Sequence, residues 1–482
     1  MVEKGILEKL TDFLLNHSFV LYPNSLRKLK EDTYIFVAKK DADKKIGILT
    51  KENFKLSSPY FAEDKNVKEI DFYLNLYPLS FENYLILKNF GISPTPCRQK
   101  SSFGTGDRLG LVTPAHIVAL KEYPVFPVLA QQSPRELEKT HRDFKDALLK
   151  VILGVLEAGY TGEFGADADH IKDEKYLLRA IEAGYTMYTL DVSELLTKIS
   201  DISSNQVMQI SPQSKEIIEA FKGKKISISE EEYTIREDEL YKSALIYEKA
   251  MNFVEKVYSI LKEKVKDFDL EISIDEGEKD TTVEDHIFVA EYLHKKGIDF
   301  WSLAPKFPGE FQKAIDYKGD INKFAVELKK HYAISQQLGG YKLSLHSGSD
   351  KFSIYEIFSE VTQHSFHIKT SGTSWLQAVN LIFEKDKKLF YELYKIALDN
   401  LEESKKAYKV LIDKDDFAEE PNLENAQILS QPEIKQLFHI SYGVLLDEKK
   451  EEIYDVLDKY EEEHYQFVSA NIKNHLEKIF NK

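Results

Sequence analysis

Gly165-Ala-Asp-Ala-Asp-His-Ile-Lys172 follows directly on Tyr160-Thr-Gly-Glu-Phe164, a short strand-like run that comes after a helical segment. We therefore expect Asp167, Asp169 and His170 to lie where a strand gives way to a loop. A carboxylate beside an imidazole can bind a divalent metal ion, or hold a base next to one. Acidic loops are common, so these residues alone do not define a site.

The same pattern, a strand followed by polar residues, recurs along the chain. It is found at Ile274-Asp-Glu-Gly277, Leu303-Ala-Pro-Lys306, Leu345-His-Ser-Gly-Ser-Asp-Lys351 and Ile368-Lys-Thr-Ser-Gly372. Polar groups at the ends of many parallel strands are how a (β/α)8 barrel forms its active site. The sequence therefore predicts an α/β fold, a TIM-like (β/α)8 barrel.

Seven strand-like runs alternate with amphipathic helices, which is typical of a parallel α/β fold. The strands are expected at 125–130, 162–165, 186–190, 270–274, 300–304, 342–345 and 366–369. Gly159, Gly184 and Gly297 are expected to end three of the helices. A closed barrel needs an eighth strand, and residues 110–112 are the candidate.

The barrel is expected to span residues 96–375, with a helical insertion at about 192–266. Residues 1–95 are expected to form an N-terminal α+β appendage, because they hold a predicted hairpin at 33–50. Residues 376–482 have helical periodicity, and we expect them to form a helical extension packed on the barrel.

Composition excludes several classes of protein. The 482 residues carry a net charge of −16, from 65 basic and 81 acidic side chains, which argues against a nucleic-acid binder. Cys97 is the single cysteine, so neither an intrachain disulfide nor a cysteine-based zinc cluster can form. We find no signal peptide and no apolar run of the roughly 18 residues that a membrane span needs. A cytoplasmic protein that binds a small molecule is expected, and the charge leaves a homo-oligomer open.

Two of the 13 histidines, His170 and His346, lie just beyond predicted strands and are the best imidazole ligands for a metal ion. A carboxylate is the usual third ligand. Glu276, Glu310 and Asp316 are the candidates, and their spacing does not choose between them. Asp169 and Glu276 also form a plausible pair for acid–base catalysis, in which one group removes a proton and the other returns it.

Basic residues near the strand ends are candidates for holding an anionic substrate. They are Arg108, Lys306, Lys351 and Lys369, and Ser347 lies in a flexible turn beside them. Arg108 belongs to a glycine-rich loop, 101–110, that lacks the third glycine and the preceding strand of a dinucleotide-binding motif. Lys369 precedes a predicted helix, whose first amides can bind a carboxylate or phosphate.

Four segments resemble the tagaturonate/fructuronate epimerase family, which includes tagatose 4-epimerase-like members. They are Phe103-Gly-Thr-Gly-Asp-Arg-Leu-Gly110, Phe164-Gly-Ala-Asp-Ala-Asp-His-Ile-Lys172, Tyr341-Lys-Leu-Ser-Leu-His-Ser-Gly-Ser-Asp-Lys-Phe352 and His367-Ile-Lys-Thr-Ser-Gly-Thr373. The similarity runs over nearly the whole chain. The resemblance implies a metal-dependent epimerase that interconverts D-tagaturonate and D-fructuronate, with activity on tagatose and fructose also open.

The resemblance also implies roles for particular residues. It implies that His170 and His346 bind the metal, that Asp169 is the base and that Glu276 is its acid partner. Asp316 is the favoured third ligand. Mixed nitrogen and oxygen ligands suit Zn, Mn, Ni or Co alike. Two alternatives remain: another metal-dependent sugar isomerase or aldolase, and a sugar-acid binding protein without catalysis.

Overall fold

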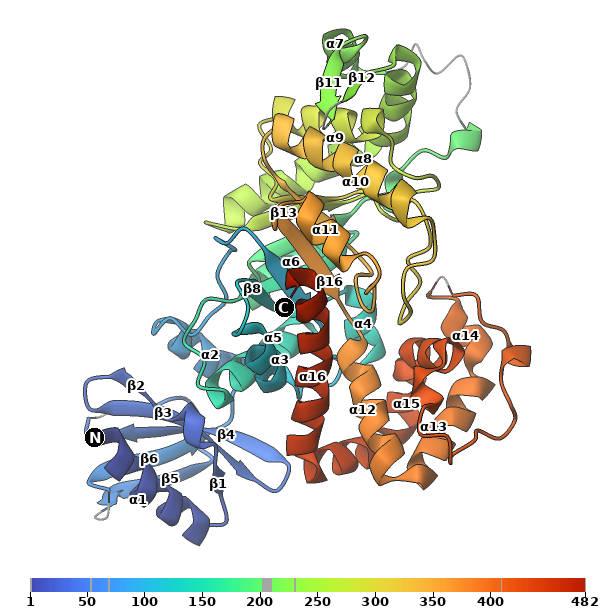
Figure 1. Cartoon of the computed structure of the whole chain (residues 1–482). Coiled ribbons are helices and arrows are strands. Elements are labelled where there is room, and N and C mark those ends of the chain that lie inside the picture. Colours follow the sequence, from blue (N-terminus) through green and yellow to red (C-terminus); the bar gives the residue numbers. More distant parts are fainter. Residues whose placement is uncertain are drawn as a thin grey trace.

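Eight parallel strands close into a barrel, shown within the whole chain in Figure 1. The computed structural model describes residues 2–52, 54–67, 70–201, 210–228, 231–408 and 410–481. The barrel strands are β7 (Ser102–Thr105), β8 (Phe126–Gln132), β9 (Gly165–Ile171), β10 (Met187–Asp191), β13 (Asp269–Ser273), β14 (Ser302–Ala304), β15 (Lys342–Leu345) and β16 (Phe366–Thr370). Each strand pairs with the next in chain order, and β16 pairs with β7. The predicted TIM-like (β/α)8 barrel is confirmed.

The eighth strand is β7, and the prediction that residues 110–112 would supply it was wrong. Those residues lead into helix α3 (Thr113–Leu120). β7 has only four residues and contains Gly104, where an added Cβ would lie 1.7 Å from Gln131 Oε1. Glycine inside a strand often marks such a close approach. Because the strand is short and lacks a bulky side chain here, its sequence resembles a loop.

The strand predicted at 162–165 is β9, which begins at Gly165 and continues to Ile171. Asp167, Asp169 and His170 therefore belong to the strand itself, and the expectation that they follow it was wrong. Asp167 and Asp169 are two positions apart, so their side chains point to the same side of the sheet. Both carboxylates contact Lys369 from β16.

Helices surround the barrel and follow its strands in turn. Besides α3 they are α4 (Pro134–Lys139), α5 (Phe144–Glu157), α6 (Glu174–Ala183), α8 (Glu237–Lys264), α9 (Val283–Lys295), α10 (Ile321–Gln337), α11 (Tyr355–Val361) and α12 (Thr373–Lys385). Capping boxes begin α5 and α9, at Asp143 and Thr282. Gly159, Gly184 and Gly297 follow α5, α6 and α9 with φ of 63°, 95° and 66°, as expected of glycines that end helices.

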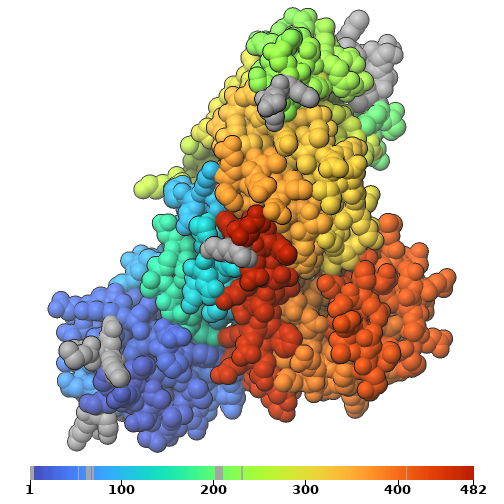
Figure 2. Space-filling view, in the orientation of Figure 1, coloured from blue at the N-terminus to red at the C-terminus, as the bar shows by residue number. Residues whose placement is uncertain are grey.

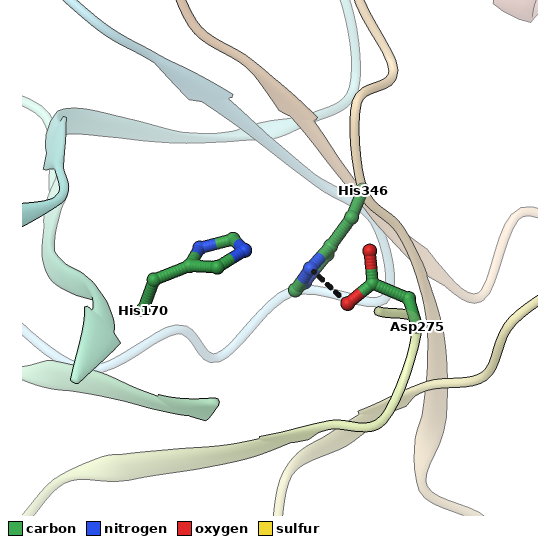
Figure 3. A group of neighbouring side chains, drawn as sticks. All are labelled: His170, Asp275 and His346. Atoms are coloured by element: carbon green, nitrogen blue, oxygen red, sulfur yellow. Dashed lines mark ion pairs between the residues drawn. The ribbon is translucent and has the colours of Figure 1, made fainter. Parts of the chain in front are cut away.

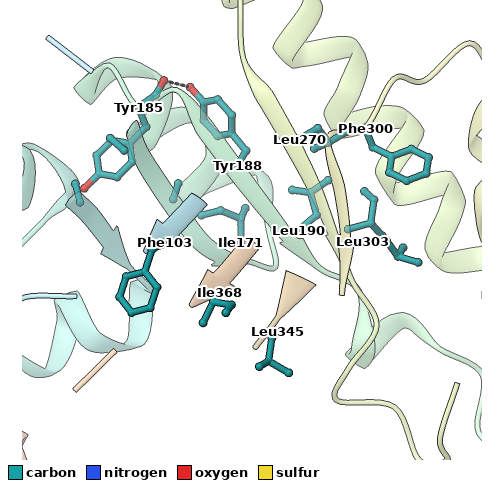
Figure 4. Packing of buried hydrophobic residues seen from close by; sticks show 14 of the residues in the cluster. Phe103, Ile171, Tyr185, Tyr188, Leu190, Leu270, Phe300, Leu303, Leu345 and Ile368 are labelled. Atoms are coloured by element: carbon teal, nitrogen blue, oxygen red, sulfur yellow. Dashed lines mark hydrogen bonds between the residues drawn. The ribbon is translucent and has the colours of Figure 1, made fainter. Parts of the chain in front are cut away.

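Several barrel strands alternate between apolar and polar residues, as β13 (Asp-Leu-Glu-Ile-Ser) and β16 (Phe-His-Ile-Lys-Thr) do. Phe103, Ile171, Leu190, Leu303 and Ile368 are buried in one hydrophobic core that the strands share with the helices (Figure 4). Polar residues next to them along the strands bond to one another across the barrel, as Lys369 does with Thr189 and Glu271. The barrel interior is therefore a polar network enclosed by an apolar shell.

The N-terminal part is an antiparallel sheet with a helix on it, seen at the lower left of Figures 1 and 2. Its elements are α1 (Val2–Asn16), β1 (Val20–Leu21), β2 (Arg27–Lys30), β3 (Thr33–Lys40), β4 (Asp43–Thr50), β5 (Phe61–Val67), β6 (Phe72–Tyr77) and α2 (Phe81–Lys88). The predicted hairpin is β3–β4. The sheet and α1 share a separate core.

Between β10 and β13 the chain forms α7 (Pro212–Phe221), a hairpin of β11 (Lys225–Ile228) and β12 (Glu231–Thr234), and then α8. Residues 202–209 and 229–230 of the expected insertion lie outside the described residues. α8 packs against α6 and α9, so it takes the place of the ring helix that follows β10. α7 and the hairpin stand at the top of Figure 1, far from the N-terminal sheet.

The C-terminal part consists of α13 (Lys387–Asp399), α14 (Leu401–Lys405), α15 (Pro432–Lys459) and α16 (Glu461–Phe480). With α12, helices α13 to α15 form a core of their own, and α15 also contacts α4, whereas the buried apolar residues of α16 belong to the core of the barrel. α16 runs back along the barrel and packs against α3, α11 and α12 (Figures 1 and 2). The domain boundaries near 95 and 375 stay a prediction. Among the described helices, none has the length and apolarity needed to cross a membrane.

Candidate active site

His170 and His346 face each other across the end of the barrel (Figure 3). His170 lies near the end of β9 and His346 follows β15 directly, and their ring centroids are 5.1 Å apart. His170 has a φ of 54°, and Ser347, which follows His346, has a φ of 49°. Few residues other than glycine adopt such values, and backbone strain of this kind gathers at functional sites. The structure thus brings together the two histidines singled out in the sequence.

Asp275 completes a group of three possible metal ligands. It lies two residues beyond β13, and its Oδ1 is 3.3 Å from His346 Nδ1 (Figure 3). One ligand atom from each of His170, Asp275 and His346 lies within 4.8 Å of the others. Two imidazoles and one carboxylate, with positions left for substrate, suit a divalent transition metal.

A buried carboxylate other than Asp275 lies beside each histidine and orients its ring. His170 Nδ1 is 2.8 Å from Asp169 Oδ1, and His346 Nε2 is 2.6 Å from Glu271 Oε1. These contacts leave the other ring nitrogens, His170 Nε2 and His346 Nδ1, as candidate metal ligands. His346 Nδ1 already lies 3.3 Å from Asp275 Oδ1 and 3.4 Å from Ser273 Oγ. Carboxylates commonly fix the remaining nitrogen of a metal-binding histidine, and so set its tautomer.

The electrostatics of the group favour positive charge. Burial lowers the pKa of His346, but the charges of Asp275 and Glu271 outweigh it and raise that pKa to about 10. Burial likewise opposes the charge of His170, and Asp169 raises its pKa above the usual value. The pKa of Asp275 is held well below its usual range, because the charge of His346 outweighs the effect of burial. A metal ion takes the place of such protons, so this donor set fits a divalent cation.

Lys369 connects the two orienting carboxylates from inside the barrel. Its Nζ lies 2.7 Å from Asp167 Oδ2, 2.8 Å from Asp169 Oδ1 and 2.9 Å from Glu271 Oε1, and it also donates to Thr189. These carboxylates raise the pKa of Lys369 against the opposing effect of burial. An ammonium has three N–H donors, so none is left for the substrate carboxylate that the sequence had suggested.

Two further cations from the sequence analysis are also engaged by the protein. Burial lowers the pKa of Lys351 to about 7, and its Nζ donates to three backbone carbonyls, those of Gln312, Ile315 and Ser349. Arg108 Nε donates to Glu136 at 3.0 Å, and its Nη1 donates to the His439 carbonyl at 2.7 Å. Lys351 therefore holds two loops together, and Arg108 ties its own loop to α4 and α15.

Asp316, the favoured third ligand in the sequence, is not in the metal group. Its Oδ1 accepts hydrogen bonds from Ser353 Oγ at 3.0 Å and from the Tyr317 amide at 2.7 Å. Asp275 lies beside His346 instead. The sequence signal for Asp275 was available, because it lies only two residues beyond a strand, whereas Asp316 lies in the long loop after β14.

Two cavities open on either side of the metal group and share Arg135 and Glu276. The larger, of about 470 Å³, is lined by Asp275 and His346, and also by Lys306, Glu310 and Ser347. The second, of about 400 Å³, is lined by His170 and Asp191. The C-terminal part forms some of the wall of the larger cavity, because Lys406, Ala407 and Tyr408 line it as well.

Glu276 and Asp191 are two of the carboxylates that line these cavities. Glu276 is exposed, whereas Asp191 is buried at the end of β10, 3.3 Å from Lys172 Nζ. One ligand atom from each of His170, Asp191 and Glu276 also lies within 4.8 Å of the others. Sequence reasoning missed Asp191 and Glu271. Asp191 lies two residues after Thr189, and Glu271 lies two residues before Ser273. Side chains two positions apart on a strand point to the same side, and this spacing would have marked both carboxylates as facing the barrel interior.

Comparison with known proteins identifies the family. A family model described as UxaE, tagaturonate epimerase, matches residues 22–479. The chain belongs to the tagaturonate epimerase family. A curated tagaturonate/fructuronate epimerase of Thermotoga maritima is 37% identical over 472 residues, which cover 95% of this chain and 96% of the relative.

Solved structures agree with this tagaturonate epimerase assignment. The native crystal structure of fructuronate-tagaturonate epimerase UxaE from Cohnella laeviribosi is 31% identical, with a TM-score of 0.89 over 98% of this chain and 99% of that one. A structure of the same enzyme with two glycerol molecules has a TM-score of 0.88 and covers 100% of both chains. As a tagaturonate epimerase family member the chain is an isomerase, and the resemblance seen in its sequence is confirmed.

Proposed function

We propose that the chain interconverts D-tagaturonate and D-fructuronate with the help of a divalent metal ion, at the site formed by His170, Asp275 and His346. The relatives reported above are named as epimerases of tagaturonate and fructuronate. The observation that carries the proposal for the site is the pair of histidines, each oriented by a buried carboxylate, between two cavities that share Glu276.

The substrate limits the chemistry. The two sugars differ at a carbon two bonds from the ketone and two bonds from the carboxylate carbon. Removing a proton next to the ketone does not invert that carbon. In a retro-aldol route, a base takes the proton of the hydroxyl on that carbon, and the hydroxyl becomes an aldehyde. The carbon–carbon bond toward the ketone breaks, and its electrons form an enediolate. The aldehyde turns over, the bond forms again on its other face, and an acid returns the proton.

His170, Asp275 and His346 would hold the metal ion through two nitrogens and one oxygen. When bound, the ion supplies Lewis-acid polarisation of the ketone and hydroxyl oxygens. Asp169 and Glu271 keep the two imidazoles in the tautomers that this binding needs. Zn, Mn, Ni and Co all suit such ligands.

Asp191 and Glu276 are proposed as the proton-transfer pair. Their carboxylate oxygens lie within 4.8 Å of each other, and both residues line the second cavity. Asp169, the base favoured by the resemblance, is a weaker candidate. Burial raises its pKa, but His170 and Lys369 outweigh burial and hold that pKa well below the usual range, so its carboxylate is a poor proton acceptor.

The test is NMR of metal-stripped protein with D-tagaturonate, before and after Mn2+ or Zn2+ is added. We expect D-fructuronate to form only with metal, and His170→Ala and His346→Ala to abolish turnover. His141→Ala is the matched control, because His141 is exposed, pairs with Asp447 and lines neither cavity. Wild-type protein that binds the sugar acid without turnover under any metal would overturn the proposal in favour of a binding protein.

Two further measurements separate the roles of the residues. Glu276→Gln should keep its metal and lose about 10²- to 10⁴-fold in turnover, as is usual when an acid–base group is removed. Turnover in D2O should leave the carbon-bound hydrogen in place at the inverted carbon. Exchange of that hydrogen with deuterium would rule out the retro-aldol route.

A further inference from the structure

Four lysine and arginine side chains line the larger cavity, and they are engaged differently. Lys406 forms an ion pair with Glu403, and Lys306 Nζ donates to the Gly277 carbonyl at 2.8 Å. Lys313 and Arg135 also line the cavity, and within the described residues neither they nor Lys306 has a carboxylate within 4.0 Å. Lys313 and Arg135 therefore bring to the cavity two positive charges that no ion pair neutralises.

Lys313 lies next to the metal group. It is half-buried in the loop between β14 and α10, and its Nζ donates to Ser347 Oγ at 2.8 Å. Ser347 directly follows His346. A substrate whose ketone lies at the metal group can therefore place its far end beside the Lys313 ammonium.

Gln312 adds an unused donor at the same place. It is buried and lines the larger cavity, and Gln436 from α15 holds its Oε1 at 3.0 Å. Its Nε2 has no hydrogen-bond partner among the described residues. A buried amide N–H without a partner costs free energy, so a ligand oxygen at this point would stabilise the complex.

Arg135 lines the same cavity as Lys313. Its Nη1 donates to the Ala407 carbonyl at 2.8 Å, and its guanidinium lies 4.6 Å from the centre of the Tyr408 ring. These contacts fix the guanidinium and leave other N–H groups for a ligand. Burial lowers the pKa of Lys313, and the positive charge of Arg135 lowers it further. An anion between the two cations would relieve this repulsion.

We propose that Lys313, assisted by Gln312 and Arg135, binds the carboxylate of the hexuronate and sets its preference over neutral ketohexoses. The inference rests on the proposed function, whose substrate is a sugar acid. A charge-assisted hydrogen bond from the ammonium to the carboxylate supplies the recognition, and a ketohexose has a neutral hydroxymethyl group in its place. Anchoring the carboxylate also keeps the aldehyde fragment in the site while it turns over.

The test compares two sugars on three metal-loaded proteins by calorimetric titration. The sugars are the equilibrated mixture of D-tagaturonate and D-fructuronate, and D-tagatose. The proteins are wild type, Lys313→Met and Lys318→Met. Lys318 is the matched control, because it is an exposed lysine of the same loop. Lys313→Met should weaken uronate binding about 30-fold or more, the usual effect of losing one partner of a close charge pair. Its binding of D-tagatose should change less than about threefold, and Lys318→Met should bind both sugars as wild type does.

Two outcomes of the titration would contradict the role proposed for Lys313. Equal weakening of both sugars by Lys313→Met, or no weakening of either, overturns the assignment. Circular dichroism checks the fold, and Lys313→Gln repeats the comparison if the methionine variant does not fold. Lys313→Arg should recover part of the uronate affinity. NMR of the same samples separates the two proposals: wild type that binds the uronate without converting it contradicts the epimerase function, while the titration still decides the role of Lys313.

Discussion

Replacing Lys369 with methionine removes an ammonium that three buried carboxylates share. Its Nζ contacts Asp167, Asp169 and Glu271 at 2.7 to 2.9 Å, and its side chain is 3% exposed. Removing one partner of a buried ion pair costs about 3–5 kcal/mol, because the remaining charge is left without compensation. We therefore expect Lys369→Met to lower the free energy of unfolding by about 3–5 kcal/mol at pH 7.

The assay is the thermal melting temperature, which should fall by on the order of 10 °C. The difference in melting temperature between wild type and the variant should become smaller as the pH is lowered. Burial raises the pKa of Asp167 to about 6 even though Lys369 opposes it. Without the lysine this pKa rises further, so a proton neutralises the carboxylate as the pH falls and stabilises the variant relative to wild type.

A double variant and a control variant test the same reasoning. Lys369→Met with Asp167→Asn should melt above Lys369→Met alone, because one uncompensated charge is gone. Lys318→Met removes an exposed lysine and should stay within about 0.5 kcal/mol of wild type. The reasoning is refuted if Lys369→Met melts within about 2 °C of wild type, or if its deficit is the same at pH 8 and pH 5.

The metal group and a second histidine pair give further predictions. Asp275→Asn should lose bound Mn2+ by elemental analysis, and Asp316→Asn should keep it, because the Asp316 carboxylate holds Ser353 instead; the reverse result would restore Asp316 as a ligand. His286 and His331 are buried with their Nδ1 atoms 2.9 Å apart, and burial lowers the pKa of His331 to about 4. The unfolded chain takes up a proton near pH 6.5, so stability should fall as the pH drops from about 6.5 toward 4. His331→Gln should be less destabilising at pH 5 than at pH 7.5 in urea unfolding; an equal effect at both values would contradict the assignment.

Much of the fold was open to prediction because it depends on patterns that repeat along the chain. Alternating strands and amphipathic helices predicted the barrel, and Gly184 marked a helix end through its left-handed backbone. β7 escaped because four residues with a glycine do not show the alternation of a buried strand. The reason for that glycine, the close approach of Gln131, exists only in the folded barrel.

The site was predictable at its strand ends and less so elsewhere. His170 and His346 come together because the carboxyl ends of parallel strands share one edge of the barrel. Lys369 was expected to bind an anion from a helix start, but it lies inside β16 and points at the carboxylates of β9. Strand parity reveals such directions only once the strand limits are known. Lys313 lies in a long loop, and its approach to Ser347 depends on a path that no local pattern fixes.

The location of the metal ion decides the central claim. Crystals of the protein soaked with Mn2+ and D-tagaturonate give its position directly through anomalous scattering. We expect one strong peak between His170 Nε2, His346 Nδ1 and the Asp275 carboxylate. A peak beside Asp191 and Glu276 that leaves His346 without metal, or no peak at the barrel end, would contradict the account.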